Sequence, residues 1–315
     1  MWDRLSHMKS AILLLSLALL ALAPPLAAQP QLPYEVVEDW PQIPESIKMG
    51  AAMGVAVDAG GHIWLYNRGT HPLIQFDKSG KVLQAWEDGA VMSHAKTAHG
   101  MRIAKDGGLW LVGREAETVW KYSPEGRAEV VIGAFGGKPG DNDSEYAFNR
   151  PAGAAFDSQG NVYIADGYQN TRVVKYTPDG KYILHWGKPG DGDGEFNLVH
   201  DVAIDPQDFV YVADRANERI QVFDQVGRFI KKWEGIGMPW GLVYDPWRKV
   251  IWMCDGQNGR VSKLSLDGEV LGVMGENGSG PGQFDQAHNI AVDEEGNLYV
   301  CETKNFRIQK FAPKK

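Results

Sequence analysis

The chain has 315 residues, with 37 glycines, 11 tryptophans and a formal net charge of -8. This length suits two average domains or one large all-β domain, and the abundance of glycine favours many tight turns over long helices. The negative charge excludes the basic surface that nucleic acid binding requires. Two cysteines are too few to stabilise a fold of this size by disulfides, so Cys254 and Cys301 are predicted to be small buried thiols.

Residues 1–28 have the pattern of a targeting segment. A short basic start at residues 8–10 precedes an unbroken apolar run at 11–23, and two prolines follow at once. The run is short for a membrane span, which favours a secretory signal peptide cleaved near Ala28 over an uncleaved anchor. The mature protein is therefore expected to be secreted or periplasmic, with no stable membrane span.

The rest of the chain repeats one unit. Each copy has an apolar strand that in most copies ends in Asp, a turn with Gly, a second apolar strand, a polar loop, an alternating strand, a turn and a last strand. The strands that open the six copies are residues 54–58, 100–104, 153–157, 201–205, 241–245 and 289–293. The Asp residues of the last four copies are 48, 40 and 48 positions apart, the span of a four-stranded propeller blade. The sequence therefore predicts an all-β, six-bladed β-propeller over residues 48–315.

The last copy needs a strand from elsewhere. It stops at Phe311 after its third strand, whereas residues 34–40 resemble the fourth strands of other copies, such as 182–186. Closing the ring in this way would remove free sheet edges. We therefore expect an N-terminal segment, residues 29–47, to carry the strand that completes the last blade.

One face of the ring is predicted to carry the function. Strands in a blade alternate in direction, so the starts of the first strands, the loops between second and third strands, and the connections between copies share a face. The opposite face carries short turns such as 59–61 and 158–160. Binding and catalytic residues usually lie on longer loops held by a rigid scaffold.

Three histidines precede the first strand in alternate copies: His99, His200 and His288. The equivalent positions of the other copies hold Met53, Ala152 and Trp240. Alternate positions of a six-fold ring lie about 120° apart and can converge on its axis. Three neutral imidazoles with an open fourth position are typical of a catalytic Zn²⁺ site, although imidazole also suits Fe, Co, Ni or Cu. A single histidine of this kind is more often structural.

The loops between second and third strands carry further candidates on this face: Arg68, Arg114, Tyr168 and Arg215. Guanidinium groups bind carboxylates bidentately, and a tyrosine beside a dication can act as a base. With a metal, these residues predict a small carboxylate-bearing substrate. The alternative is that the arginines bridge neighbouring blades. We interpret as scaffold the arginines that open three of the third strands, Arg172, Arg219 and Arg307.

The six copies resemble NHL repeats. More specifically, nearly all of the mature chain is similar to peptidyl-α-hydroxyglycine α-amidating lyase (peptidylamidoglycolate lyase), the domain that completes peptide C-terminal amidation. The similar segments include 53–58 (MGVAVD), 98–101 (AHGM), 166–172 (DGYQNTR), 199–203 (VHDVA), 213–217 (ADRAN) and 284–289 (FDQAHN). The ordered set of these motifs is much more specific than the repeats alone.

The resemblance implies an enzyme, a carbon–nitrogen lyase that converts a carbinolamide into an amide and glyoxylate. Its pattern implies three zinc ligands, His99, His200 and His288. It also implies three catalytic residues, Tyr168, Arg68 and Arg215.

The resemblance further implies a structural Ca²⁺ in the channel. Its ligands would be the carbonyls of Val55 and Met101 and the side chain after the third histidine. That residue is Asn289 here, where the family has Asp, and the loss of a carboxylate should weaken calcium binding. Gln286 stands where the family has Met.

Two other classes of function stay open. A non-catalytic NHL propeller would bind a partner at the mouth of its channel, and it would tolerate loss of the Tyr168 hydroxyl. Another metal-dependent propeller lyase or lactonase is the second alternative, although such enzymes typically use carboxylate-rich calcium sites. We expect a monomer acting on a peptide or small carboxylate-bearing substrate, and not on nucleic acid.

Overall fold

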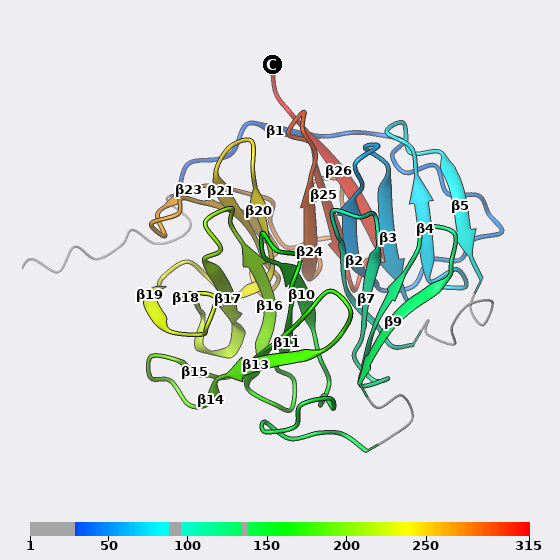
Figure 1. Cartoon of the computed structure of the whole chain (residues 1–315). Helices are drawn as coiled ribbons and strands as arrows, with labels where there is room; N and C mark the ends of the chain where they lie inside the picture. The colour runs from blue at the N-terminus through cyan, green and yellow to red at the C-terminus, as the bar shows by residue number, and fades with distance from the viewer. Residues whose placement is uncertain (1–28, 88–95, 134–137) are drawn as a thin grey trace, which may run out of the picture.

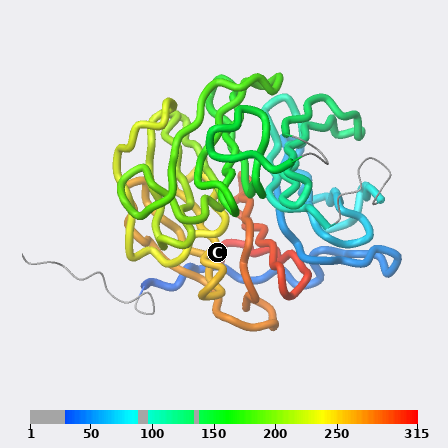
Figure 2. Tube along the Cα trace, turned by 90° about the horizontal axis from the view of Figure 1, so that it is seen from below, coloured from blue at the N-terminus to red at the C-terminus, as the bar shows by residue number. Residues whose placement is uncertain are grey.

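The computed structural model describes residues 29–87, 96–133 and 138–315. Within these ranges the regular elements are β-strands and one 3-10 turn, η2 (Arg215–Asn217). Six four-stranded sheets follow one another around a central axis, and Figure 2 shows the chain passing around the ring in order, from cyan to red. The predicted six-bladed propeller is therefore confirmed. The signal peptide expected at residues 1–28 lies outside the described residues, and the described part contains no helix able to cross a membrane.

The first five blades are antiparallel sheets of consecutive strands, with the first strand of each innermost (Figure 1). In chain order they are β2 (Ala52–Val57), β3 (Ile63–Asn67), β4 (Leu73–Phe76) and β5 (Val82–Trp86); β6 (Ala98–Ile103), β7 (Leu109–Gly113), β8 (Thr118–Tyr122) and β9 (Ala128–Gly133); β10 (Gly153–Phe156), β11 (Val162–Asp166), β12 (Arg172–Tyr176) and β13 (Tyr182–Trp186); β16 (Val199–Ile204), β17 (Val210–Asp214), β18 (Arg219–Phe223) and β19 (Phe229–Trp233); β20 (Pro239–Asp245), β21 (Val250–Asp255), β22 (Arg260–Leu264) and β23 (Val270–Met274). A small parallel pair, β14 (Lys188–Pro189) and β15 (Glu195–Phe196), lies between the third and fourth blades.

The sixth blade is closed by the N-terminal strand. From the inside outward it consists of β24 (Ala287–Val292), β25 (Leu298–Glu302), β26 (Arg307–Pro313) and β1 (Tyr34–Val36). β1 pairs antiparallel with β26, with Tyr34 opposite Pro313 and Val36 opposite Phe311. The predicted closure is confirmed, but the strand ends at Val36 and does not extend to Trp40.

The N-terminal segment joins three blades. Gln31 forms a bridge with Val273 in the fifth blade, and β1 completes the sixth. Trp40 then packs against Tyr299 of the sixth blade and Phe76 of the first, with ring centroids 5.0 and 5.8 Å apart. Figure 1 shows this blue segment crossing from β23 over β1 toward β5. Residues 31–40, here called the clasp, therefore link the fifth, sixth and first blades where the ring closes.

Deleting residues 29–41 should therefore expose the edge of β26 and produce aggregation. Size-exclusion chromatography and thermal unfolding would measure the effect, with a chain lacking only residues 1–28 as the control. A soluble and cooperatively folded deletion variant would show that the clasp is dispensable.

The core lies between the blades. Six buried apolar clusters each combine residues of two neighbouring blades. Trp64, Trp110 and Trp252, all on second strands, are almost completely buried within them. Replacing one such ring with alanine would cost about 3–5 kcal/mol. Cys254 and Cys301 are free and buried here, as predicted, and burial raises the pKa of both thiols well above the usual value.

The recurring Asp of the repeat has a structural role. Asp157 Oδ1 accepts hydrogen bonds from the backbone N–H groups of Gln159 and Asn161, at 3.0 and 2.9 Å. Its other oxygen accepts from Tyr163 Oη at 3.3 Å. Asp205 makes the equivalent bonds in the fourth blade. This side chain closes the turn after the first strand and explains its return in most copies.

Candidate metal centre

The three predicted histidines converge at the mouth of the channel. His99, His200 and His288 lie near the starts of β6, β16 and β24, the innermost strands of alternate blades. Their ring centroids are 4.7, 5.1 and 5.1 Å apart, which makes a nearly equilateral triangle. All three are buried, and their possible ligand atoms lie within 4.8 Å of one another. Residues nearly 190 positions apart are thus brought into one three-histidine cluster that could bind a metal.

Each imidazole is oriented by the neighbouring blade. The three Nδ1 atoms each lie 2.7 Å from a backbone carbonyl oxygen, those of Ala152, Trp240 and Met53 respectively. A carbonyl only accepts, so each Nδ1 carries the hydrogen and each Nε2 keeps a lone pair. The carbonyls belong to the residues that fill the histidine position in the other three blades, so imidazoles and carbonyls alternate around the ring.

A glycine permits this close approach. Gly100 follows His99 directly, and a Cβ atom on it would lie 2.4 Å from the Ala152 carbonyl oxygen. Any larger residue there would push the acceptor of the His99 ring away. The glycine of the AHGM segment therefore serves the orientation of the imidazole.

At least two of the three Nε2 atoms have no hydrogen donor among the described residues, and the three together fit a cation. Tyr168 Oη lies 3.1 Å from His99 Nε2 and 3.0 Å from His200 Nε2, but its single hydrogen can satisfy only one of them. His288 Nε2 is buried without a hydrogen-bond partner among the residues that the structure describes. Unsatisfied buried lone pairs are costly, and three imidazole nitrogens suit a divalent transition metal.

Burial keeps these imidazoles neutral, which is the form that binds metals. It is the largest cause that holds the pKa values of His99 and His200 well below the ordinary value, and a neighbouring histidine adds to it. Burial also lowers the pKa of His288 to about 3, with further lowering by the positive charge of Arg215.

Stability without metal should therefore fall as the pH drops below about 6.5, where histidines of the unfolded chain take up protons. Folded His288 stays neutral down to about 3. Between these values the unfolded state binds more protons, so acid favours unfolding. From about pH 7.5 to about pH 5.5, His288 should account for about 1.4 kcal/mol of the loss.

Denaturant unfolding in chelator at both pH values, for wild type and His288→Gln, would measure this contribution. The loss of unfolding free energy on acidification should be smaller in the variant by about 1.4 kcal/mol. An equal loss in both proteins would contradict a neutral, buried His288.

A pocket of about 480 Å³ opens above the histidines. It is lined by all four loop residues predicted for this face, Arg68, Arg114, Tyr168 and Arg215. Lys304 adds a further positive charge, whereas no carboxylate is among its described lining residues. The pocket is therefore suited to an anionic ligand.

The arginines surround Tyr168. Arg215 Nη1 lies 3.5 Å from Tyr168 Oη, and its guanidinium stacks 3.6 Å from the ring centre of Trp240. The guanidinium of Arg114 lies 4.7 Å from the Tyr168 ring centre. Arg68 Nη2 is buried and makes no hydrogen bond within the described residues, although it lies 3.7 Å from Glu115 Oε2. Arg68 thus keeps a donor free for a ligand.

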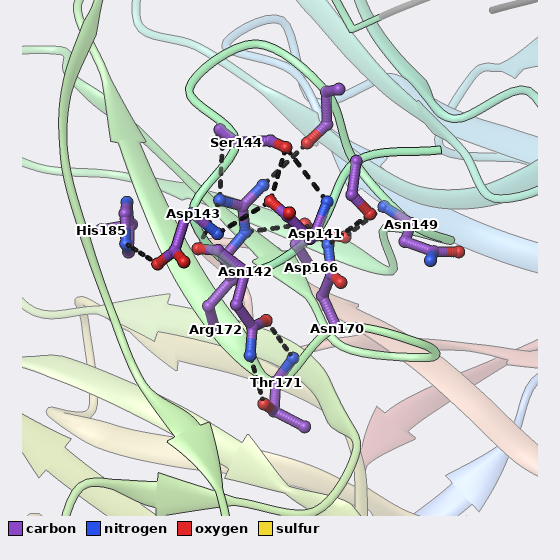
Figure 3. Close-up of polar contacts among 12 residues, drawn as sticks. Asp141, Asn142, Asp143, Ser144, Asn149, Asp166, Asn170, Thr171, Arg172 and His185 are labelled. Atoms are coloured by element: carbon purple, nitrogen blue, oxygen red, sulfur yellow. Dashed lines mark hydrogen bonds and ion pairs between the residues drawn. The ribbon is translucent and has the colours of Figure 1, made fainter. Parts of the chain in front are cut away.

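A buried ion pair holds the loop that carries Tyr168 (Figure 3). Asp166 Oδ2 accepts from Arg172 Nε at 2.9 Å and from Asn170 Nδ2 at 2.8 Å, and Oδ1 accepts from the Asn149 backbone at 2.9 Å. Arg172 also donates at 2.9, 2.6 and 2.8 Å to three carbonyls of the preceding connection, those of Asn142, Ser144 and Ala147. This network joins the loop of Tyr168 to the connection before the blade, and it supports the scaffold role assigned to Arg172.

The expected calcium site does not fit the residues present. Two of its implied oxygens, Met101 O and Asn289 Oδ1, accept hydrogen bonds from Arg102 Nη1 at 2.9 and 3.1 Å. Asn289 Oδ1 also accepts from the backbone N–H of Val55, whose carbonyl is the third implied ligand, at 3.4 Å. Sequence reasoning missed Arg102. The sequence did contain a sign of this contact, because Arg102 and Asp201 have opposite charges and lie on two strands that both line the channel.

Comparisons with known proteins agree with the fold and with the repeats. The NHL repeat family matches residues 148–176, 196–223 and 284–311. NHL repeat-containing protein 3 of Homo sapiens is 30% identical over 301 residues, covering 89% of this chain and 84% of that protein. Peptidyl-alpha-hydroxyglycine alpha-amidating lyase 1 of Drosophila melanogaster is 26% identical over 339 residues, covering 89% of this chain and 60% of that protein.

This chain spans about a third of the length of a further relative. Peptidyl-glycine alpha-amidating monooxygenase A of Xenopus laevis is 26% identical over 319 residues, which cover 88% of this chain and 33% of that protein. Among solved structures, a streptogramin B lyase superposes with a TM-score of 0.62 at 14% identity, covering 89% of this chain and 98% of that one. At this identity the likeness shows the propeller fold.

Proposed function

Since this chain belongs to the NHL-repeat proteins, we propose that it is a metal-dependent carbon–nitrogen lyase that cleaves a carbinolamide such as a peptidyl-α-hydroxyglycine. One observation carries the proposal: three buried Nε2 lone pairs converge beside Tyr168 Oη, in a pocket lined by arginines. Relatives named amidating lyases support the reaction class.

The cluster of His99, His200 and His288 would hold the metal, with zinc proposed because three neutral imidazoles and an open position are typical of its catalytic sites. A bound Zn²⁺ would supply Lewis acidity toward the substrate hydroxyl. Its binding would also satisfy the lone pairs that Tyr168 cannot.

The arginines would hold the substrate by its carboxylate. Arg68 has a free buried donor, and Arg215 lies against the Trp240 ring beside Tyr168. Two guanidinium groups in one pocket can bind a carboxylate and oppose the negative charge that builds up during the reaction. A substrate without a carboxylate should bind poorly.

Tyr168 would act as the general base. Tyr168 would first lose its own proton, a loss that a bound cation favours, and would react as the phenolate. The phenolate oxygen would take the proton of the substrate hydroxyl, the C–N bond would break with its electron pair moving to nitrogen, and the C–O bond would become a carbonyl. Tyr168 would then return that proton to the nitrogen. The products are an amide and glyoxylate, with no net change in protons and no covalent intermediate.

The test combines metal analysis with an assay. Purified protein should contain about one zinc per chain and should release glyoxylate from a peptidyl-α-hydroxyglycine, whereas His200→Ala should lose both. His62→Ala is the matched control, because His62 is 40% exposed and lies on the opposite face. Absence of transition metal after zinc is offered would overturn the proposal. Bound zinc without turnover would favour the alternative of a propeller that binds a partner at this pocket.

We also propose a cellular location, an oligomeric state and a substrate class for this activity. We propose that the mature protein is secreted or periplasmic, on the pattern of residues 1–28, and that it acts as a monomer. Its substrate would be a peptide or a small carboxylate-bearing molecule, in keeping with the basic pocket.

A further inference from the structure

We infer that Arg102 supplies the structural cation of the channel, in the place where the family resemblance implies calcium. This role does not depend on the proposed reaction, because it concerns how the blades are joined. The groups involved lie one to three residues beyond the histidines, or beyond Trp240 in β20, along the innermost strands.

The guanidinium of Arg102 bonds to oxygens of four blades. Nη1 donates to Met101 O at 2.9 Å in its own strand, β6, and to Asn289 Oδ1 at 3.1 Å in β24. Nη2 donates to Asp201 Oδ2 at 2.8 Å in β16 and to Leu242 O at 2.6 Å in β20. The two terminal nitrogens carry four hydrogens, so all of them are used. One side chain therefore joins four of the six innermost strands.

Asp201 provides the matching charge. Its side chain is 2% exposed and that of Arg102 is 13% exposed, so the pair is largely shielded from water. Asp201 Oδ2 also accepts from the Leu242 backbone at 2.9 Å and from Asn289 Nδ2 at 3.3 Å. One positive and one negative charge leave the cluster neutral, as a buried group must be to avoid a large desolvation cost.

This arrangement explains the residue after the third histidine. The amide of Asn289 accepts from Arg102 through Oδ1 and donates to Asp201 through Nδ2. An aspartate at this position could only accept when ionised, and it would place a second negative charge beside Asp201. The change from Asp to Asn therefore suits a guanidinium in the channel and does not suit a calcium ion.

Calcium and Arg102 would compete for two oxygens, Met101 O and Asn289 Oδ1. Ca²⁺ takes six to eight oxygen ligands, and Met101 O and Asn289 Oδ1 are two of those implied for it. An entering ion would have to displace the guanidinium or lie beside its positive charge, and both cost free energy. The blades should therefore stay joined without calcium.

The first test compares purified wild-type protein with and without calcium, after treatment with chelator. Calorimetric titration and the Tm from circular dichroism are the readouts. Calcium at about 5 mM exceeds the dissociation constants typical of extracellular sites, yet it should neither bind nor raise the Tm. One bound calcium per chain with a Tm raised by several degrees would overturn the inference.

The second test removes the guanidinium. Arg102→Ser should lower the Tm by about 5–15 °C, because it leaves Asp201 buried without its partner, and calcium should restore part of the loss. Arg127→Ser is the matched control, since Arg127 is 78% exposed, and it should change the Tm by no more than about 1 °C. An unchanged Tm in Arg102→Ser, with no response to calcium, would refute the role of Arg102.

Two more variants keep the test decisive if the serine variant does not fold. Arg102→Lys keeps the charge but loses the planar fork, so it should fold with a smaller drop in Tm. Arg102→Ser combined with Asn289→Asp restores a carboxylate, and it should bind calcium about tenfold more tightly than Arg102→Ser alone or recover folding only with calcium. A double variant indifferent to calcium would count against the inference.

Discussion

Replacing Tyr168 with phenylalanine should lower kcat for carbinolamide cleavage by roughly 10²–10⁴, the range typical of the loss of a general base. The metal content should not change, because the three histidines take their orientation from backbone carbonyls and not from Tyr168. The phenyl ring should keep its place beside Arg114. Elemental analysis and a steady-state assay of glyoxylate release would measure both effects.

Measuring kcat and KM separately distinguishes a catalytic base from a residue that only shapes the pocket. A base that acts only on the reacting hydroxyl should affect kcat strongly and KM little, whereas a residue that merely shapes the pocket should raise KM. Tyr146→Phe is the matched control, because Tyr146 is half exposed and lies outside the pocket. Near-normal turnover in Tyr168→Phe with one metal per chain would exclude Tyr168 as the base.

The second large effect is expected in stability. Arg172→Met should lower the free energy of unfolding by about 3–5 kcal/mol, because it leaves the buried carboxylate of Asp166 without its partner. It also removes the bonds to the connection before the third blade, including that to Ser144 (Figure 3). Denaturant unfolding would measure the loss, with the exposed Arg228→Met as the control.

A double variant separates the charge from the scaffold. Adding Asp166→Asn to Arg172→Met removes the unpaired buried charge and should recover part of the stability. Activity should stay low in both variants, because the loop of Tyr168 has lost its link to the connection. Wild-type stability in Arg172→Met would show that the pair contributes little to the fold.

Local patterns of the chain were sufficient to predict the propeller. In three copies the Asp of the turn accepts hydrogen bonds from backbone N–H groups two and four residues away, as Asp157 does, and such contacts can be inferred from spacing alone. Repetition then places equivalent residues at equivalent points of a ring, which is why His99, His200 and His288 could be expected to meet. The missing fourth strand of the last copy similarly pointed to residues 34–40.

Sequence patterns could not predict contacts between residues that do not recur at equivalent positions of the repeat. The hydrogens on the imidazoles depend on carbonyls of neighbouring blades, such as that of Ala152, which no motif distinguishes. The free donor of Arg68 and the stacking of Arg215 on Trp240 likewise depend on how the loops pack over the channel. These details decide which groups are available to a ligand.

By itself, the sequence determined the architecture and the set of candidate site residues, because a unit repeated six times places equivalent residues at equivalent points of a ring. Only the tertiary structure decided what fills the channel below the histidines. Arg102 meets Asp201, Leu242 and Asn289, which lie 99, 140 and 187 positions away in the chain. Closure of the ring brings these groups together. One guanidinium then donates to four oxygens, and two of them, Met101 O and Asn289 Oδ1, are oxygens that the resemblance alone would have assigned to calcium.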